Sequence, residues 1–392
     1  MDGNNNLFVA DTNKSRVLEF LDPLASGVSC TPNADGSGCA GDTTVDYVLG
    51  QSNLINTGCD DGGVSASNLC MPYGIAVDPG TNNLYVADVN NNRVVVFPAP
   101  ISTGESAAQV WGEPDFDANI AGTGPDLFEF PDGVALDGAH NLYVSDTFNM
   151  RVLEYPAGSP YPSTSPGTSW GVGDASDFSD SGQCGVGYSG QTVMPNAFKG
   201  IGIALDSSGG LYVADACASR ILVFDNALAP TESGTRVLGQ ADLAHGANGN
   251  ETFNASMLAP NSLVVDSQGH LYVVDSDDSR VLGWNSASSF TDGQGADLVI
   301  GQPDFASFIA NQDSADGNPT VASLNYPFGI AVDFKDNLYV VDEYNSGCWS
   351  TTLHSPASMG CRWRVRAPAG YGVRGQILPV EIPTRAGSAR AR

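Results

Sequence analysis

Residues 82–97 have the sequence Asn-Asn-Leu-Tyr-Val-Ala-Asp-Val-Asn-Asn-Asn-Arg-Val-Val-Val-Phe, and this stretch decides the fold. It contains two short runs of aliphatic and aromatic residues, 84–87 and 94–97. β-Branched and aromatic residues favour strands, and the polar segment between the two runs is prone to turn. The stretch therefore predicts a β-hairpin.

The hairpin recurs along the chain. Each copy has Leu, an aromatic residue, Val, a variable residue and Asp, and in five copies an arginine stands five residues after that Asp. The copies lie at residues 6–17, 82–97, 141–152, 211–221, 271–281 and 337–342. The last copy lacks the arginine at that distance, and we expect Arg364 and Val365 to replace it. Six copies in 392 residues predict a repeat architecture.

Each hairpin has a further strand on either side. A preceding strand, Pro-x-Gly-(Ile/Val)-Ala-(Val/Leu)-Asp, stands at 72–78, 131–137 and 327–333, with variants at 202–206 and 260–266. A following strand stands at 47–51, 110–113, 169–172, 236–240 and 298–302. Four short strands form one blade of a β-propeller, and such a blade must pack against others to bury its faces. The sequence thus predicts an all-β, six-bladed β-propeller with four-stranded antiparallel blades.

The two ends of the chain are expected to meet. The first copy enters at its second strand, because Asp2 aligns with the Asp that ends the preceding strand in the other copies. We expect the segment 377–382, Ile-Leu-Pro-Val-Glu-Ile, to supply the missing inner strand of the first blade; the alternative is a chain that begins partway through a longer one and lacks this strand. Residues 1–382 then form one propeller domain, and 383–392 a loose basic tail.

The repeated pattern resembles the NHL repeat, a propeller-forming family that usually has six blades. The resemblance covers most of residues 2–376. It implies the fold more than a function, because similar propellers serve as binding modules, as RNA-binding domains, as extracellular sensors and, in a few branches, as enzymes such as the peptide-amidating lyase.

The charge of the chain excludes one class of partner. It has 44 acidic and 16 basic side chains, a net charge of −28, and seven of the basic residues lie beyond residue 360. Phosphate binding needs a basic surface, so we expect no nucleic-acid partner. No stretch approaches the roughly 20 continuous apolar residues of a membrane helix, so membrane insertion is not expected.

The eight cysteines fall in close sequential pairs and predict disulfides. The expected pairs are Cys30 with Cys39, Cys59 with Cys70, Cys184 with Cys217, and Cys348 with Cys361. None has the C-x-x-C spacing of a zinc site. Disulfides imply an oxidising compartment, so we expect an extracellular or periplasmic protein. No secretory signal precedes the first hairpin, which predicts that a leader has been removed or that the chain begins partway through a longer one.

The repeated Asp and Arg of the hairpin turns are expected to be structural ion pairs. They are Asp11 with Arg16, Asp88 with Arg93, Asp146 with Arg151, Asp215 with Arg220, and Asp275 with Arg280. A carboxylate at such a turn can accept backbone N–H groups while the guanidinium pairs with it. Catalysis rarely needs the same pair in every repeat, so we assign them no catalytic role.

Metal binding is left open by the sequence. No metal is required by any motif, but carboxylates at 60–61, 275–278, Asp313 and Asp316 offer oxygen ligands for calcium, and a channel on the propeller axis is a second possible place. The four histidines, His140, His245, His270 and His354, occupy non-equivalent positions and are not expected to converge on a zinc ion. No catalytic residue is carried over from the lyase branch.

The long connections between blades predict where function lies. In a four-stranded blade they share one face with the turn between strands two and three, and the longest are 52–70, 174–199 and 303–326. We expect a binding or interaction module for a protein, peptide or glycan on this long-loop face. The alternatives are a metal-assisted lyase or lactonase-like enzyme with its site at the channel, and a structural part of an extracellular assembly. Aromatic residues in the connections, among them Phe128, Phe130, Tyr188, Phe198, Phe253 and Tyr326, are expected to pack under their own loops more than to line a ligand.

Overall fold

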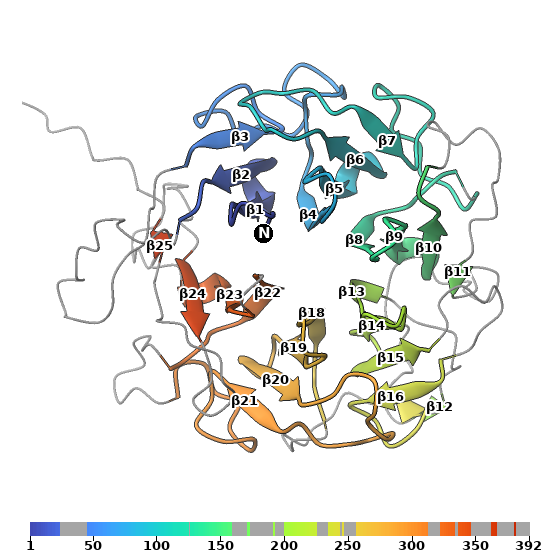
Figure 1. Ribbon diagram of the computed structural model, residues 1–392, viewed down its shortest axis with the longest axis vertical. Coiled ribbons are helices and arrows are strands. Elements are labelled where there is room, and N and C mark those ends of the chain that lie inside the picture. The colour runs from blue at the N-terminus through green and yellow to red at the C-terminus, as the bar shows by residue number, and fades with distance from the viewer. Residues whose placement is uncertain are drawn as a thin grey trace, which may run out of the picture.

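The computed structural model arranges short antiparallel strands around a central axis, with their inner ends toward a common channel (Figure 1). It describes residues 1–23, 45–124, 126–158, 171–172, 191–192, 200–225, 234–243, 245–246, 256–312, 322–333, 336–345, 362–366 and 380–381. Sheets are named below after their first strand in the chain.

The strands have the following bounds. The β1 sheet holds β1 (Leu7–Asp11), β2 (Arg16–Phe20) and β3 (Tyr47–Leu49), and the β4 sheet holds β4 (Pro72–Val77), β5 (Leu84–Asp88), β6 (Arg93–Phe97) and β7 (Gln109–Trp111). The β8 sheet holds β8 (Pro131–Leu136), β9 (Leu142–Asp146), β10 (Arg151–Tyr155) and β11 (Gly171–Val172), and the β13 sheet holds β13 (Gly200–Leu205), β14 (Leu211–Asp215), β15 (Arg220–Phe224) and β16 (Arg236–Leu238). The β18 sheet holds β18 (Pro260–Val265), β19 (Leu271–Asp275), β20 (Arg280–Trp284) and β21 (Leu298–Ile300), and the β22 sheet holds β22 (Pro327–Val332), β23 (Leu338–Asp342), β24 (Arg362–Arg366) and β25 (Val380–Glu381). Two short strands, β12 (Gln191–Thr192) and β17 (His245–Gly246), pair with each other.

Five sheets have the four antiparallel strands expected of a propeller blade, so the all-β propeller prediction is confirmed at this level. The predicted count of six such blades is not confirmed. Among the described residues the β1 sheet has three strands, because the chain reaches β1 directly from the turn that begins at Asp2.

The hairpin that repeats in the sequence pairs the second and third strands with one register throughout. Asp88 pairs with Arg93, Asp146 with Arg151, and Asp275 with Arg280, so each Asp–Arg couple closes its hairpin. A single turn of 3₁₀ helix joins the strands at η1 (Thr12–Lys14), η2 (Val89–Asn91), η3 (Thr147–Asn149) and η5 (Glu343–Asn345).

The β22 sheet differs from the sequence prediction in two ways. Trp363 pairs with Val341, so the arginine that comes next to Asp342 in the register is Arg362, and the expectation of Arg364 is wrong by two residues. The segment 377–382 was expected to complete the first blade, but its described part, β25, pairs with β24 at the outer edge of the β22 sheet. A long insertion separates β23 from β24. The sequence alone does not show where this insertion ends, so it does not determine which residues of the two strands pair.

The hydrophobic core lies between the facing surfaces of neighbouring sheets. One cluster joins Val94, Val96 and Trp111 of the β4 sheet to Val144 and Leu153 of the β8 sheet, and similar clusters fill the other interfaces. Each face of a sheet is buried only by packing against the adjacent sheet, so contacts between repeats stabilise the propeller.

The inner strands approach one another closely through a glycine. A Cβ added at Gly133 would lie 2.5 Å from the Ile201 carbonyl oxygen of the next inner strand, and one at Gly202 would lie 2.5 Å from the Asn261 carbonyl oxygen. Gly74 makes the same approach to the Asp132 carbonyl oxygen. Gly329 does not, since its nearest neighbour would be the flexible Val341 side chain at 3.0 Å.

We expect Gly133→Ala to lower the free energy of unfolding by about 1–3 kcal/mol, because a methyl group there must push two inner strands apart. Urea denaturation of the purified chain measures this. Gly329→Ala is the matched control and should cost clearly less; equal losses in the two variants would show that the close approach does not matter.

Candidate functional site

The Asp–Arg pairs predicted from the sequence come together in the structure. The arginine Nε lies 2.8 Å from the aspartate Oδ2 in the Asp11–Arg16, Asp88–Arg93, Asp146–Arg151, Asp215–Arg220 and Asp275–Arg280 pairs. Side chains of the Asp88–Arg93 and Asp275–Arg280 pairs are fully buried.

Each pair fixes a hairpin turn to the long connections around it. Arg93 donates to the carbonyl oxygens of Ser65, Asn68 and Phe116, at 2.9, 2.9 and 2.6 Å. Asp88 accepts the backbone N–H of Cys70 at 2.6 Å, just before the inner strand. The pairs therefore hold the long connections in place.

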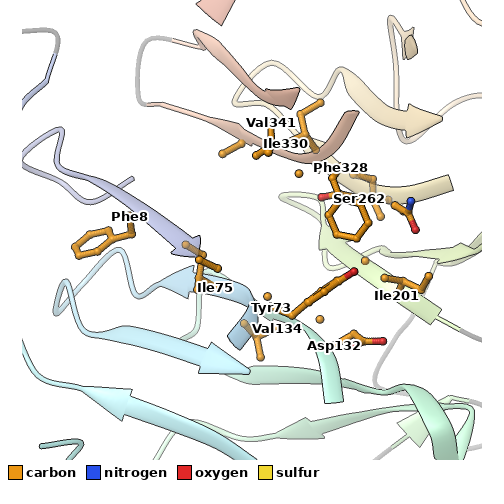
Figure 2. A pocket seen from close by; sticks show the side chains of 18 of the residues that line it. Phe8, Tyr73, Ile75, Asp132, Val134, Ile201, Ser262, Phe328, Ile330 and Val341 are labelled. Carbon is orange, nitrogen blue, oxygen red and sulfur yellow. The ribbon is translucent and has the colours of Figure 1, made fainter. Parts of the chain in front are cut away.

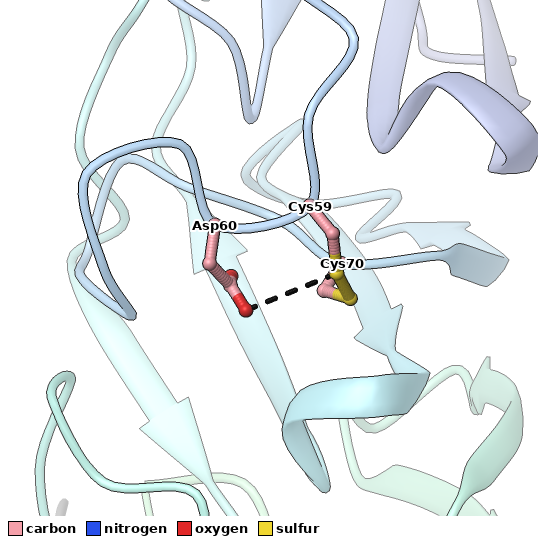
Figure 3. A group of neighbouring side chains, drawn as sticks. All are labelled: Cys59, Asp60 and Cys70. Atoms are coloured by element: carbon pink, nitrogen blue, oxygen red, sulfur yellow. Dashed lines mark hydrogen bonds between the residues drawn. A yellow bond between two sulfur atoms is a disulfide. The ribbon is translucent and has the colours of Figure 1, made fainter.

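The Cys59–Cys70 disulfide staples one long connection, as the sequence predicts (Figure 3). Its Cα atoms are 4.5 Å apart, and Asp60 lies beside it. The two sulfur atoms are bonded to each other, so neither is a free thiolate for a metal. Cys217 is also disulfide-bonded. The other predicted cysteines, Cys30, Cys39, Cys184, Cys348 and Cys361, lie outside the described residues, as do Asp313 and Asp316.

A cavity of about 270 Å³ follows the propeller axis (Figure 2). Its wall is mainly aliphatic, with Ile75, Val134 and Ile330 among the side chains that line it. Asp132 is the one carboxylate, and no histidine occurs, among the described lining residues. This channel suits an apolar occupant better than a metal ion.

Three pairs of aromatic side chains lie at the end of the sheets where the inner strands begin. Tyr73 and Phe328 face each other edge to face, with ring centres 5.1 Å apart (Figure 2). The Phe130 and Phe148 ring centres lie 4.6 Å apart, and those of Tyr326 and Tyr344 are stacked at 4.8 Å. We call these six residues the aromatic mouth.

Two pairs of the aromatic mouth are positioned by the same backbone arrangement. Phe130 and Tyr326 directly precede an inner strand, and Phe148 and Tyr344 are the middle residues of the 3₁₀ turns η3 and η5. The Phe148 N–H donates to the Glu129 carbonyl oxygen at 3.1 Å, and the Tyr344 N–H donates to that of Asn325 at 3.1 Å. Each pair thus joins the start of an inner strand to the hairpin turn of the same sheet.

Carboxylates stand among these aromatic rings. Burial raises the pKa of Tyr326, and the negative charges of Asp277 and Glu343 raise it further. Burial also raises the pKa of Glu343. The side chain of Tyr344 is 57% exposed, so the aromatic mouth combines accessible apolar surface with negative charge.

Three aromatic residues that the sequence singles out lie in the described structure. Phe130 and Tyr326 belong to the aromatic mouth, and Phe128 is buried against Tyr155 as the packing expectation requires. Tyr188, Phe198 and Phe253 lie outside the described residues. Tyr73 and Phe328 were not predicted from the sequence, although their place between Pro and Gly of the inner strand was a signal for a channel-facing side chain.

The histidines do not converge within the described part of the chain. His140 Nδ1 lies 2.8 Å from Asp78 Oδ1, and His270 Nδ1 lies 2.7 Å from Asp266 Oδ2. Both stand in turns at the opposite end of the sheets from the aromatic mouth. His245 is in β17, and His354 lies outside the described residues.

Repeated antiparallel sheets around an axis, five of them with an Asp–Arg pair at the hairpin turn, define this chain as a β-propeller of the repeat class. The family model described as "NHL repeat" matches residues 69–97, 201–224 and 258–284. The chain therefore contains NHL repeats in these three places.

Two curated relatives are similar over most of this chain. The proteins named NHL repeat-containing protein 2 of Bos taurus and Homo sapiens are each 27% identical, over 299 and 300 residues that make up 71% of this chain. The chain spans only 38% of the length of each relative.

Two solved structures are similar to this chain at low identity. A chain of a nidogen/laminin complex is 15% identical, with a TM-score of 0.46 over 91% of this chain and 88% of that one. A virginiamycin B lyase from Staphylococcus aureus is 10% identical, with a TM-score of 0.42 over 87% of this chain and 74% of that one. No helix in the described residues is long and apolar enough to cross a membrane.

Glu113 occupies a position where the β1, β13 and β18 sheets have glutamine. Gln51 donates to the Ser15 carbonyl oxygen at 3.0 Å, and Gln302 donates to that of Ser279 at 3.1 Å. Glu113 Oε2 is buried without a hydrogen-bond partner, and burial raises the pKa of Glu113 to about 7. A protonated carboxyl group can supply the donor that glutamine supplies elsewhere.

We expect Asp88→Asn to lower the free energy of unfolding by about 3–5 kcal/mol, because it leaves the buried Arg93 guanidinium without its counter-charge. Asp225→Asn is the matched control, since Asp225 pairs with Arg236 at a side-chain exposure of 51% and should cost at most about 1 kcal/mol. Urea denaturation measures both; similar losses would contradict the structural role of the buried pair.

We expect Glu113→Gln to stabilise the chain at pH 8 by about 1–3 kcal/mol, with a gain that shrinks toward pH 5. The folded state holds the Glu113 proton up to about pH 7 and the unfolded state releases it near pH 4.5. Unfolding therefore becomes easier as pH rises through this window, and the glutamine removes that slope. Urea denaturation at several pH values tests this, and a gain independent of pH would refute the titration of Glu113.

Proposed function

We propose that this chain is an exported protein-binding module that uses its long-loop face, with the aromatic mouth at the centre. NHL-repeat β-propellers commonly serve as protein-interaction modules. The single observation that carries the proposal is the set of three aromatic pairs at the end of the sheets where the hairpin turns and long connections lie. Exposed apolar clusters with a polar rim are typical of interaction sites.

The charges around the aromatic mouth favour a positively charged partner. Asp132, Asp277 and Glu343 stand near its rings, and the chain as a whole has a net charge of −28. Lysine and arginine side chains bind the faces of aromatic rings, and carboxylates at the rim steer them toward the site. We therefore propose a basic peptide segment of a protein as the ligand, in preference to a glycan.

We also propose that the β1 sheet is the sixth blade of the ring. It carries the same hairpin as the five four-stranded sheets and lies between the β22 and β4 sheets (Figure 1). Its strands β2 and β3 pair as the third and fourth strands do elsewhere.

Export is supported by the disulfides. Cys59 is bonded to Cys70, and Cys217 is also disulfide-bonded. Structural disulfides persist in oxidising compartments, which favours an extracellular or periplasmic location. Calcium in the channel or the acidic loops stays a prediction, and nothing in the described channel lining favours the lyase or lactonase alternative over binding.

We expect a labelled twelve-residue peptide rich in lysine and arginine to bind the chain, and an acidic peptide of the same length not to bind. Tyr344→Ala and Glu343→Gln should each weaken binding roughly 5- to 10-fold, as the loss of an aromatic or charged anchor does. Fluorescence anisotropy in 50 and 200 mM salt measures the affinity.

Asp297→Asn is the matched control for Glu343→Gln, because Asp297 is an exposed carboxylate in the loop between β20 and β21, at the opposite end of the sheets. It should leave binding unchanged. Equal weakening by both substitutions would show that the peptide binds through the net charge of the chain and not through the aromatic mouth. Absence of binding to basic peptides would contradict this ligand class.

A further inference from the structure

The connection between β21 and β22 exposes two large apolar side chains in succession. Phe308 and Ile309 are 50% and 58% exposed. Their backbone is nevertheless fixed, because the Gln302 side-chain amide and the Gln312 N–H both donate to the Ile309 carbonyl oxygen, at 3.1 and 3.2 Å. The Ile309 N–H donates to Gln312 Oε1 at 3.3 Å. A surface that is already ordered costs a ligand little conformational entropy on binding.

Two asparagines join this connection to the aromatic mouth. The Asn311 Nδ2 group donates to Asn345 Oδ1 at 2.8 Å, and the Asn345 Nδ2 group donates to Asn311 Oδ1 at 2.9 Å. Both residues are buried. Ile309 stands two residues before Asn311, and the exposed Tyr344 stands directly before Asn345, so one fixed contact holds them near each other. We call Phe308, Ile309 and Tyr344 the apolar patch.

The β8 sheet has the same arrangement with a more polar surface. Asn149 Nδ2 donates to the Gly122 carbonyl oxygen at 2.7 Å, and Ile120, two residues before Gly122, is 51% exposed. The residue before Ile120 is Asn119, whose side-chain amide donates to the hairpin turn of the β4 sheet. The fold therefore does not require a phenylalanine at the corresponding position, Phe308, which favours a role for that residue in binding.

Negative charge surrounds the apolar patch. The carboxylates of Asp277 and Glu343 act electrostatically on the tyrosine ring that is stacked against Tyr344. Asp304 is exposed in the same connection, and residues 302–312 include no lysine or arginine. A second copy of the chain, with its net charge of −28, would be repelled, whereas a basic segment is complementary in charge.

We propose that the apolar patch binds a large aliphatic side chain, leucine or isoleucine, from the same partner segment whose lysine or arginine binds the aromatic mouth. This assignment rests on the proposed function, because both side chains belong to one peptide. Tyr344 is part of both surfaces, so the aliphatic group packs against Phe308 and Ile309 while the basic group reaches the Tyr344 ring. The ligand is thus an amphipathic basic segment.

The aliphatic contact would supply specificity that charge alone does not. A chain with a net charge of −28 attracts any basic peptide, and such attraction weakens as salt rises. Burial of an aliphatic side chain depends on shape and contact area and is not screened by salt. The preference for an amphipathic segment should therefore be clearest at high salt.

The test compares two labelled twelve-residue peptides with the same lysines and arginines, one with two leucines and the other with serines in their place. We expect the leucine peptide to bind the purified chain roughly 5- to 10-fold more tightly, as burial of an aliphatic side chain predicts. Fluorescence anisotropy in 200 mM salt measures both affinities. Equal binding would overturn this assignment and leave the proposed function standing, whereas failure of both peptides to bind would overturn the two together.

The double variant Phe308→Ser with Ile309→Ser supplies the decisive measurement, because both side chains are largely exposed and their loss should leave the chain folded. It should remove most of the leucine preference and leave the affinity for the serine peptide unchanged. Ile55→Ser is the matched control, since Ile55 is a 79% exposed isoleucine in the connection between β3 and β4, and it should keep the full preference. A preference that persists in the double variant, or is lost equally in the control, would refute the site.

Discussion

The Asp–Arg pair at five of the hairpin turns is the interaction on which the rest of the structure depends. Its aspartate accepts an N–H at the entrance of the inner strand, and its arginine donates to carbonyl groups of the connections on both sides, as Asp88 and Arg93 do. Polar groups buried at this density are tolerable only when all are satisfied. The pair thereby fixes the backbone of the irregular connections. Because that backbone is fixed, aromatic side chains from different sheets are held at set distances from one another.

Places where the repeat departs from its own rules are the places to which we assign function. The mouth has aromatic residues at Phe148 and Tyr344, where other turns have Asn13 and Asn90. A sequence that satisfies every local rule elsewhere is expected to break them where binding requires it.

Much of the fold could be predicted because the signal was local and repeated. The hairpins, the five Asp–Arg pairs and the Cys59–Cys70 disulfide depend on residues close together in the chain. The pairing of β25 with β24 and the place of Arg362 could not be predicted, because a long insertion separates each strand from its partner and leaves the register open. The aromatic mouth was found only in part, since Tyr73 and Phe328 are 255 residues apart and meet only when the sheets surround a common axis.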